Sequence, residues 1–309
     1  MRIIKYLFLV TIFTTTVFAN DYNYNLKPEK IAKNTYVFIG KKEYFNVKNG
    51  GDISNSAFIV TADGVIVIDT GSSSKYAEQM KKAISKITKK PIVLVINTHH
   101  HPDHFLGNSA FKDVNIISTK HTKEDITNNG DMYITNLMNI TYKWMQGTSV
   151  KAPNVELDEI KDKYIKLGNH KLKLIFLNGH THSDLVLYDE YTKTLFASDL
   201  IFYNRAAATP HANIENWISA LENLRQVNYK VLVPGHGPIS STKEPFDQVK
   251  KYLIYLDETL KNSAKEGLSV FEILQLPKPK EFVNLAMLDE EFERSVINLY
   301  PEYENELMK

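Results

Sequence analysis

Five apolar stretches of the chain each run, within a few residues, into a histidine or an aspartate. The stretches are GVIVI, IVLVI, KLKLIFL, TLFA and KVLV, and the polar residues after them are Asp69, residues 99–104, His180, Asp199 and His236. Short apolar runs of this kind are typical of buried β-strands. Ligand-binding groups of α/β folds gather beyond the carboxyl ends of strands, so we expect these five strand ends to build one site.

Strand and helix patterns alternate along most of the chain. Strands are expected at 35–40, 56–61, 64–71, 91–99, 114–119, 171–180, 184–190, 194–199 and 230–236. Helices are expected at 72–90, within 119–146, at 214–227 and 241–267, and again within 269–277 and 288–309. Residues 62–64 predict a hairpin turn, and Pro245 is expected in the first turn of its helix. The alternation indicates an α/β protein with one main core.

The segment HHHPDH has a spacing suited to metal binding. Residues two apart in an extended segment point the same way, so His99 and His101 can reach one cation together. Asp103 and His104 follow Pro102, where the chain turns, and can face a neighbouring position. The chain contains no cysteine. Imidazole and carboxylate ligands without thiolate suit Zn²⁺ and tolerate Fe or Mn.

Together with later motifs, this segment resembles the signature of the metallo-β-lactamase-fold hydrolases. The matching motifs are His99-x-His101-x-Asp103-His104, Gly179-His180-Thr181, Asp199 and Gly235-His236-Gly237, preceded by Val-Ile-Asp69-Thr-Gly. They cover about residues 30–240 in the family's order. The resemblance implies a four-layer αβ/βα sandwich, in which two facing sheets carry helices on their outer sides. We therefore expect a hydrolase domain over residues 20–262 and a C-terminal helical extension over 263–309.

The resemblance also implies two metal ions and a role for each motif residue. Asp103 would accept a hydrogen bond from a water molecule shared by two Zn²⁺ ions and later move its proton. Asp69 would orient the histidine-rich loop without binding metal. The implied ligands are His99, His101 and His180 for the first ion, Asp103, His104 and His236 for the second, and Asp199 as a bridge between them.

The function implied by the resemblance is that of an exported hydrolase acting on a small ester, thioester, lactone or amide. β-Lactamase activity is less favoured, because lactam-hydrolysing members typically lack or replace the bridging carboxylate that Asp199 supplies. Persulfide dioxygenases on this fold are an alternative: they keep the motif but use one iron ion, with His99, His180 and Asp199 as the matching ligands. A periplasmic metal carrier or inactive binding module is a third hypothesis, which the complete ligand set disfavours.

Longer stretches are similar to a narrower group within that family. HPDHFLGNSAF, FASDLIFYNRAAATPHANIENWISALENL and VLVPGHGP resemble periplasmic zinc metallohydrolases found beside bacterial sulfur-oxidation and quinoprotein dehydrogenase systems. One departure concerns the bridging residue: the family's usual Phe-x-Gly-Asp reads Phe-Ala-Ser198-Asp here. We expect this change to leave Asp199 in place.

Residues beside the motifs have less specific expectations. His100 is out of phase with its neighbours and should point away from the metal. Candidate substrate contacts in loops near the motifs are His182, Arg205 and His211. Structural roles are expected for Asp184 in its loop, Trp144 and Trp217 in the core, and His121 and His170 at surface or capping positions.

The first residues resemble a secretory signal peptide. Residues 1–19 combine a basic start with an apolar segment, and Val17-Phe18-Ala19 fits a cleavage site. The apolar segment is shorter than the roughly 20 residues that span a bilayer, so we expect no stable membrane insertion after cleavage. Abundant Lys, Asn and Ile suggest a bacterial source and hence the periplasm. The formal net charge of +1 gives no reason to expect a nucleic-acid partner.

Overall fold

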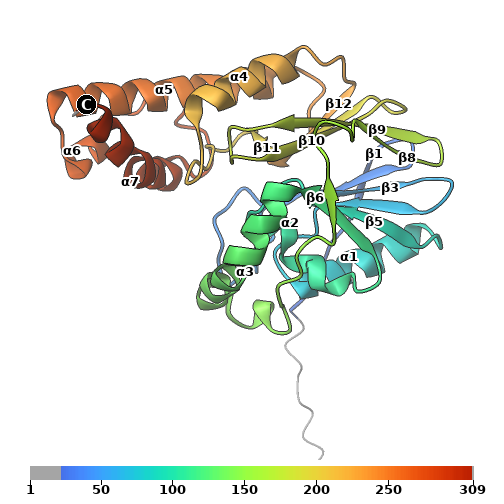
Figure 1. The fold of residues 1–309 in the computed structure, drawn as a ribbon. Helices are drawn as coiled ribbons and strands as arrows, with labels where there is room; N and C mark the ends of the chain where they lie inside the picture. Colours follow the sequence, from blue (N-terminus) through green and yellow to red (C-terminus); the bar gives the residue numbers. More distant parts are fainter. Residues whose placement is uncertain (1–21, 308–309) are drawn as a thin grey trace, which may run out of the picture.

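Two facing β-sheets form the centre of the molecule, and helices cover the outer face of each (Figure 1). This computed structural model describes residues 22–307. The layering confirms the expected αβ/βα sandwich with further helices near the C-terminus. The predicted signal peptide at 1–19 lies outside the described residues.

The first sheet has seven strands in the order β1-β2-β3-β4-β5-β6-β7. The strands are β1 (Glu29–Ala32), β2 (Thr35–Phe38), β3 (Ser56–Val60), β4 (Val65–Ile68), β5 (Ile92–Ile96), β6 (Asn115–Thr119) and β7 (Val155–Leu157). Pairing is antiparallel from β1 to β4 and parallel from β4 to β7. The predicted hairpin turn joins β3 to β4, and Thr61 N donates to Gly64 O over 2.8 Å. Because β4 and β5 are parallel, Asp69 and the histidine-rich segment emerge at the same edge.

The second sheet has five strands in the order β12-β11-β10-β9-β8. These are β8 (Tyr164–Leu167), β9 (His170–Leu177), β10 (Asp184–Asp189), β11 (Thr194–Phe202) and β12 (Val231–His236). β10 is antiparallel to both β9 and β11, and β11 is parallel to β12. β9, β11 and β12 therefore run in one direction. His180 follows β9 and His236 ends β12, whereas Asp199 lies inside β11, which continues to Phe202 beyond the predicted end at residue 199.

Helices connect the strands and cover the sheets. They are α1 (Ser74–Ile87), α2 (Pro102–Phe105), η1 (Leu106–Ala110), α3 (Lys120–Thr141), η2 (Tyr142–Met145), α4 (Ile214–Arg225), α5 (Glu244–Glu266), α6 (Val270–Leu274) and α7 (Leu288–Leu307). The side chains of Ser73 and Asn213 cap α1 and α4 by accepting from Tyr76 N and Asn216 N. Pro245 lies in the first turn of α5, as predicted. Within residues 22–307, no helix is both long and apolar enough to cross a membrane.

Apolar layers between the sheets and on their outer faces stabilise this arrangement. Residues such as Ile66, Ile96, Leu174 and Val233 pack between the sheets. A second layer joins β11 to α4, α5 and α7 and contains the fully buried Trp217. Trp144 is also buried, so both tryptophans lie in the interior as predicted.

The C-terminal helices belong to this second layer. Phe292 and Val296 of α7 are fully buried in the same cluster as Leu253 and Leu256 of α5. The expected domain boundary after residue 262 falls inside α5, which continues to Glu266. The extension thus packs on α5, which contacts β11, and on the loop that follows β11.

Candidate metal centre

The histidine-rich loop begins where β5 ends at Ile96. His99 and His101 lie in the non-helical segment before Pro102, and Pro102 begins the short helix α2 that carries Asp103 and His104. The chain thus turns at Pro102, as expected from the sequence. This turn divides the loop into two pairs of side chains that face different parts of the site.

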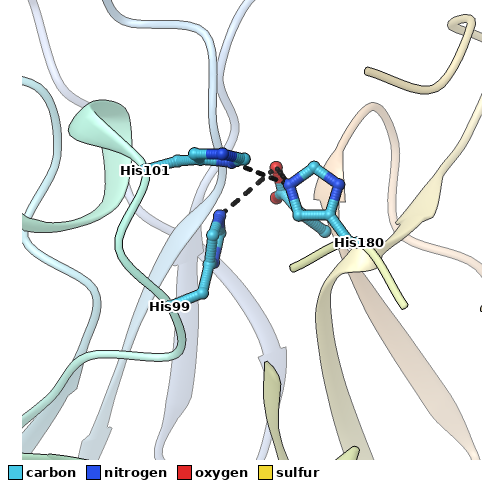
Figure 2. Close-up of side chains that lie close together, drawn as sticks. His99, His101 and His180 are labelled. Carbon is cyan, nitrogen blue, oxygen red and sulfur yellow. Dashed lines mark hydrogen bonds and ion pairs between the residues drawn. The ribbon is translucent and has the colours of Figure 1, made fainter. Parts of the chain in front are cut away.

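The first group of side chains consists of His99, His101, His180 and Asp199. One nitrogen or oxygen atom of each lies within 4.8 Å of the corresponding atoms of the other three. Figure 2 shows the three imidazoles converging on one carboxylate. His180 Nε2 is 2.8 Å from His101 Nδ1, and Asp199 Oδ2 is 3.4 Å from His180 Nε2 and 3.7 Å from His99 Nε2. Three imidazoles and a carboxylate at this spacing form a donor set suited to Zn²⁺.

The second group consists of Asp103, His104 and His236, again with ligand atoms within 4.8 Å of one another. Asp103 Oδ2 is 3.7 Å from His104 Nε2 and 3.4 Å from His236 Nε2. Asp199 also reaches this group: its Oδ1 is 3.0 Å from His104 Nε2 and its Oδ2 is 3.1 Å from His236 Nε2. The Asp199 carboxylate therefore lies between the two groups.

Burial keeps the first three histidines in the form that binds metal. The side chains of His99, His101 and His180 are buried, and this loss of solvation lowers the pKa of each, to about 3 for His180. Neighbouring imidazoles lower the pKa of His99 and His101 further. A neutral imidazole has a free lone pair for a cation.

Carboxylates dominate the surroundings of His104. Burial alone would lower its pKa, but Asp199, Asp103 and Asp69 together raise it well above the usual value. Burial also opposes the charge on Asp199, yet its interactions with His104, His236 and His99 hold its pKa well below the usual value. No lysine or arginine is within salt-bridge distance of these three carboxylates in the part of the chain that the structure describes. A cation would balance this buried negative charge.

Unpartnered atoms at the centre fit the same interpretation. His104 Nε2 and Asp199 Oδ1 lie 3.0 Å apart without forming a hydrogen bond, and His99 Nε2 is likewise buried without a hydrogen-bond partner among the described residues. Buried polar atoms are normally paired, because leaving one unpaired costs about 1–3 kcal/mol. Since these atoms all point into the two groups, the residues present fit a pair of metal ions.

Asp69 supports the loop from behind. Its Oδ1 accepts from Thr98 N over 2.9 Å, and its Oδ2 accepts from Thr98 Oγ1 and His104 Nδ1, each over 2.8 Å. A left-handed backbone with φ 58° turns Asp69 at the end of β4. This arrangement orients His104 with Nε2 toward Asp199, which is the positioning role expected for Asp69.

Outer hydrogen bonds also orient other histidines. His236 Nδ1 donates to Ile53 O over 2.8 Å, which directs Nε2 into the site. His101 Nε2 shares a 2.8 Å hydrogen bond with His211 Nδ1, which leaves His101 Nδ1 facing His180. His211, expected as a substrate contact, therefore also positions His101.

Ser198 occupies the position where the resembled motif has glycine. Its backbone is left-handed, with φ 48°, a conformation that glycine adopts without steric cost. The Ser198 hydroxyl shares a 2.7 Å hydrogen bond with Thr98 Oγ1. This contact attaches β11, the strand that carries Asp199, to the histidine-rich loop, and Asp199 keeps its central position as expected.

Three predicted residues that flank the proposed ligands lie outside the two groups around Asp199. His100 Nδ1 is 3.3 Å from Asp125 Oδ2. His100 belongs to neither group around Asp199, although its ligand atom lies within 4.8 Å of those of His101 and His211 in a third cluster without a carboxylate. His182 also contacts Asp125, at 3.2 Å, and its side chain is 55% exposed. It is not among the residues that line the pocket over the metal centre, and its contact with substrate stays a prediction. Asp184 accepts from Thr181 N and Oγ1, a structural role as expected.

The prediction for His170 is wrong. It was expected at the surface or in a capping position, yet it is 1% exposed. Its Nδ1 donates to Asp189 Oδ2 over 2.9 Å, across the pair β9 and β10. The charged partner makes the burial of this histidine tolerable. His121, in contrast, is exposed in the first turn of α3, as expected.

A pocket opens over the metal centre. Its floor includes His101, Asp103, Asp199 and His236. The walls come from the loop before β3, from α3, from the loop after β11 and from α7, and their residues include Tyr44, Phe45, Tyr133, Leu137, Ile140, Arg205, His211, Glu291 and Arg294. The sequence patterns did not single out Glu291 and Arg294, because no local motif marks them.

Comparison with known proteins agrees with this geometry. A family model described as the metallo-beta-lactamase superfamily matches residues 49–236, more than half of the chain. The linear primary-alkylsulfatase of Pseudomonas sp. (strain ATCC 19151) is 20% identical over 71% of this chain and 49% of its own length. The chain thus spans about half of that relative. The metallo-beta-lactamase type 2 of Bacillus cereus is 24% identical over 60% of this chain and 68% of its own length.

A solved structure supports the fold. The metallo-beta-lactamase from Pontibacter korlensis superimposes with a TM-score of 0.61 and 24% identity, and the match covers 74% of this chain and 99% of that one. Two facing sheets with outer helices are therefore shared with a known protein of this architecture.

Proposed function

We propose that this chain, which belongs to the metallo-beta-lactamase superfamily, is a metal-dependent hydrolase that works with two metal ions. The observation that carries this proposal is the Asp199 carboxylate, whose oxygens lie within 3.0–3.7 Å of imidazole nitrogens from both groups. A carboxylate in that place can bridge two cations. A site for one ion would not need the second group at similar spacing.

We assign the first ion to His99, His101 and His180, and the second to Asp103, His104 and His236, with Asp199 as bridge. The imidazole-rich donor set favours Zn²⁺, although Fe or Mn would also fit it. When bound, the ions would act as Lewis acids that activate water and polarise the scissile bond. The buried setting of these residues keeps bulk water away from the reacting atoms.

Asp103 is the residue we propose as proton carrier. Its Oδ2 faces both His104 and His236 at the floor of the pocket. From there it can accept a proton from the attacking water and deliver it to the leaving group. No serine or cysteine nucleophile is needed for this chemistry.

The substrate we propose is a small molecule with a hydrolysable ester, thioester, lactone or amide bond. The relatives support a hydrolytic reaction without agreeing on the bond, because one is named an alkylsulfatase and another a β-lactamase. Lactam hydrolysis is the second candidate. Asp199 makes it less favoured, since lactam-hydrolysing members typically lack or replace this carboxylate.

Metal content separates hydrolysis from the oxidative alternative. A persulfide dioxygenase-like enzyme would contain one iron ion per chain, held by His99, His180 and Asp199. The second group of ligand atoms, from Asp103, His104 and His236, supports a second cation instead. We also propose export to the periplasm, as the signal-like residues 1–19 and the stretches similar to periplasmic sulfur-oxidation-associated members suggest.

The deciding experiment is metal analysis of the purified mature protein, combined with a panel of esters, thioesters, lactones and β-lactams. We expect about two zinc ions per chain and turnover of at least one substrate class. One iron per chain with oxygen consumption on a persulfide would instead establish the oxidative alternative. Failure across the whole panel with zinc present would favour the metal carrier or binding module.

N-terminal sequencing of the periplasmic fraction tests cleavage after Ala19.

A further inference from the structure

We propose that α7 completes the metal pocket with an anion-binding site, in which Arg205 and Arg294 recognise an oxyanion group of the substrate. The group would be a carboxylate or a sulfate, away from the bond that is hydrolysed. This inference rests on the proposed function, because it names the chemistry of the substrate for the same pocket.

Glu291 holds the two arginines together. Arg205 Nη2 donates to its Oε1 over 3.0 Å, and Arg294 Nη1 donates to its Oε2 over 2.8 Å. Glu291 is fully buried. Two cationic groups share one carboxylate, so one positive charge remains without a counter-ion inside this cluster. All three residues line the same pocket as His101 and Asp199.

Arg205 has unused hydrogen-bonding capacity. Its side chain is 2% exposed, yet its Nε and Nη1 have no partner among the described residues. A guanidinium carries five N–H donors in a fixed fork, which matches the planar oxygens of a carboxylate. Its Cζ lies 5.5 Å from the ring centroid of Phe202. A buried arginine held on a pocket wall with free donors is suited to an anionic ligand.

Arg294 is the accessible member of the pair. Its side chain is 33% exposed, and its Cζ lies 5.3 Å from the centroid of the Tyr44 ring, which also lines the pocket. It lines the same pocket as His211 and Asp199, so its charge faces the cavity over the metal centre.

The loop that carries Arg205 is attached to the C-terminal extension. Ala206 N donates to Ala286 O over 2.9 Å, and Thr209 Oγ1 donates to Ser295 Oγ over 2.7 Å. Ser295 Oγ in turn donates to Glu291 O over 2.6 Å. These contacts give the extension a function: it fixes the charged wall relative to the metal centre.

The remaining wall defines the rest of the ligand. Tyr133, Leu137 and Ile140 of α3 present largely apolar surface to the pocket. A ligand that fits both walls carries an apolar body and one anionic group. We therefore expect anionic small molecules to bind better than neutral ones of the same size.

The test uses the full mature chain loaded with zinc and two arginine variants. Arg294→Gln removes the charge from the pocket. Arg225→Gln is the matched control. It removes an arginine that pairs with Asp247 at the surface and does not contact Glu291. Circular dichroism and zinc content establish that both variants fold and keep metal.

Binding is measured by calorimetry with glutarate, propane-1,3-disulfonate and the neutral diamide glutaramide. We expect the wild type and Arg225→Gln to bind at least one dianion, and Arg294→Gln to bind it at least tenfold more weakly, because charge-assisted hydrogen bonds are lost. Tighter binding of glutarate identifies a carboxylate, and tighter binding of the disulfonate identifies a tetrahedral sulfur oxyanion, the class to which sulfate belongs. Equal affinity in Arg294→Gln, or no preference of the wild type for a dianion over glutaramide, would overturn the proposal.

Turnover is measured in parallel with mono-4-nitrophenyl adipate and the neutral 4-nitrophenyl hexanoate. We expect Arg294→Gln to raise KM at least tenfold for the anionic ester, with kcat and the neutral ester little changed. A purely structural role would alter both esters alike and would contradict the inference. If neither ester is hydrolysed while dianion binding depends on Arg294, the proposed reaction fails and the anion site stands.

Discussion

His104 Nδ1 donates a 2.8 Å hydrogen bond to Asp69 Oδ2, and His104 Nε2 then faces Asp199 Oδ1 at 3.0 Å. The orientation of a proposed metal ligand thus depends on a buried carboxylate that does not itself reach either ligand group. Asp69 also accepts two hydrogen bonds from Thr98, so it links the end of β4 to the start of the histidine-rich loop.

Replacing Asp69 by alanine should therefore weaken metal binding without removing a ligand. We expect zinc affinity to fall about 10–100-fold, mainly at the second ion, because outer-shell partners typically contribute this much. Competition with a chromophoric chelator measures the affinity. Asp113→Ala, which alters an exposed carboxylate before β6, is the control. Unchanged zinc affinity in Asp69→Ala would show that His104 keeps its orientation without this support.

Three consecutive histidines offer a direct test of the ligand assignment. His99→Ala and His101→Ala should each lose most of the first metal ion and reduce turnover by at least 100-fold, a size consistent with loss of metal activation. His100→Ala should retain nearly all metal, because His100 faces Asp125 rather than the ligand groups. Elemental analysis after dialysis against buffer without metal measures the content. Loss of metal from His100→Ala alone would contradict the geometry.

The strands that the sequence predicted are those with their own apolar pattern. GVIVI and IVLVI form β4 and β5, which lie inside the first sheet. The strands that it missed are β1, β7 and β8, with the sequences EKIA, VEL and YIKL. Most of their side chains are exposed or half-buried, so they carry no clear pattern. Their conformation depends on backbone pairing with a neighbouring strand, which no local signal shows.

The same distinction applies to the site. The metal-centre residues follow predicted strand ends, so their convergence follows from the direction of those strands. Glu291 and Arg205 are 86 residues apart in sequence, and Glu291 with Arg294 would look like an ordinary helical surface pair. His170 was misplaced for a similar reason: its partner Asp189 is 19 residues away on another strand. Tertiary contacts alone bring these charges into the interior.

The buried His170–Asp189 pair makes stability depend on pH. Burial would raise the pKa of Asp189, but hydrogen bonds from His170 and Thr192 outweigh it and lower the pKa below the usual 3.8. A carboxylate with a lowered folded-state pKa stabilises the protein above its unfolded value, and this contribution is lost as the pH falls through the lowered one. We therefore expect a fall in melting temperature below about pH 4.

Asp189→Asn tests this dependence by removing the charge. The variant should be less stable at pH 7, by about 1–3 kcal/mol, because the charged hydrogen bonds are lost. Its melting temperature should also fall less steeply than that of the wild type below pH 4. Asp63→Asn, at the β3–β4 turn, controls for loss of a carboxylate elsewhere. Parallel pH profiles of the wild type and Asp189→Asn would remove this pair as the cause.

Phe292 tests whether the C-terminal helix shares the main core. It is fully buried against α5, whereas Ile297 on the same helix is 52% exposed. Phe292→Ala should destabilise the protein by about 3–5 kcal/mol, the usual cost of such a cavity, and Ile297→Ala should have little effect. Urea denaturation should show one transition in both. A separate early transition that alone responds to Phe292→Ala would mean that the extension unfolds independently.

Gly235 lies directly behind the bridging carboxylate, and its lack of a side chain is part of the site. A Cβ at this position would overlap Asp199 Oδ1 and would come within 2.7 Å of Asp199 N. Gly235→Ala must therefore displace either Asp199 or the end of β12 that carries His236. Because displacements of about 1 Å can cost roughly 100-fold in rate, we expect turnover to fall at least that much and metal content to fall below two ions.

Gly147→Ala is the control. No atom lies within 4 Å of its added Cβ, and its φ of 85° imposes the general backbone strain of replacing a glycine. Full metal content and turnover in Gly235→Ala would show that Asp199 does not need its observed position between the two groups.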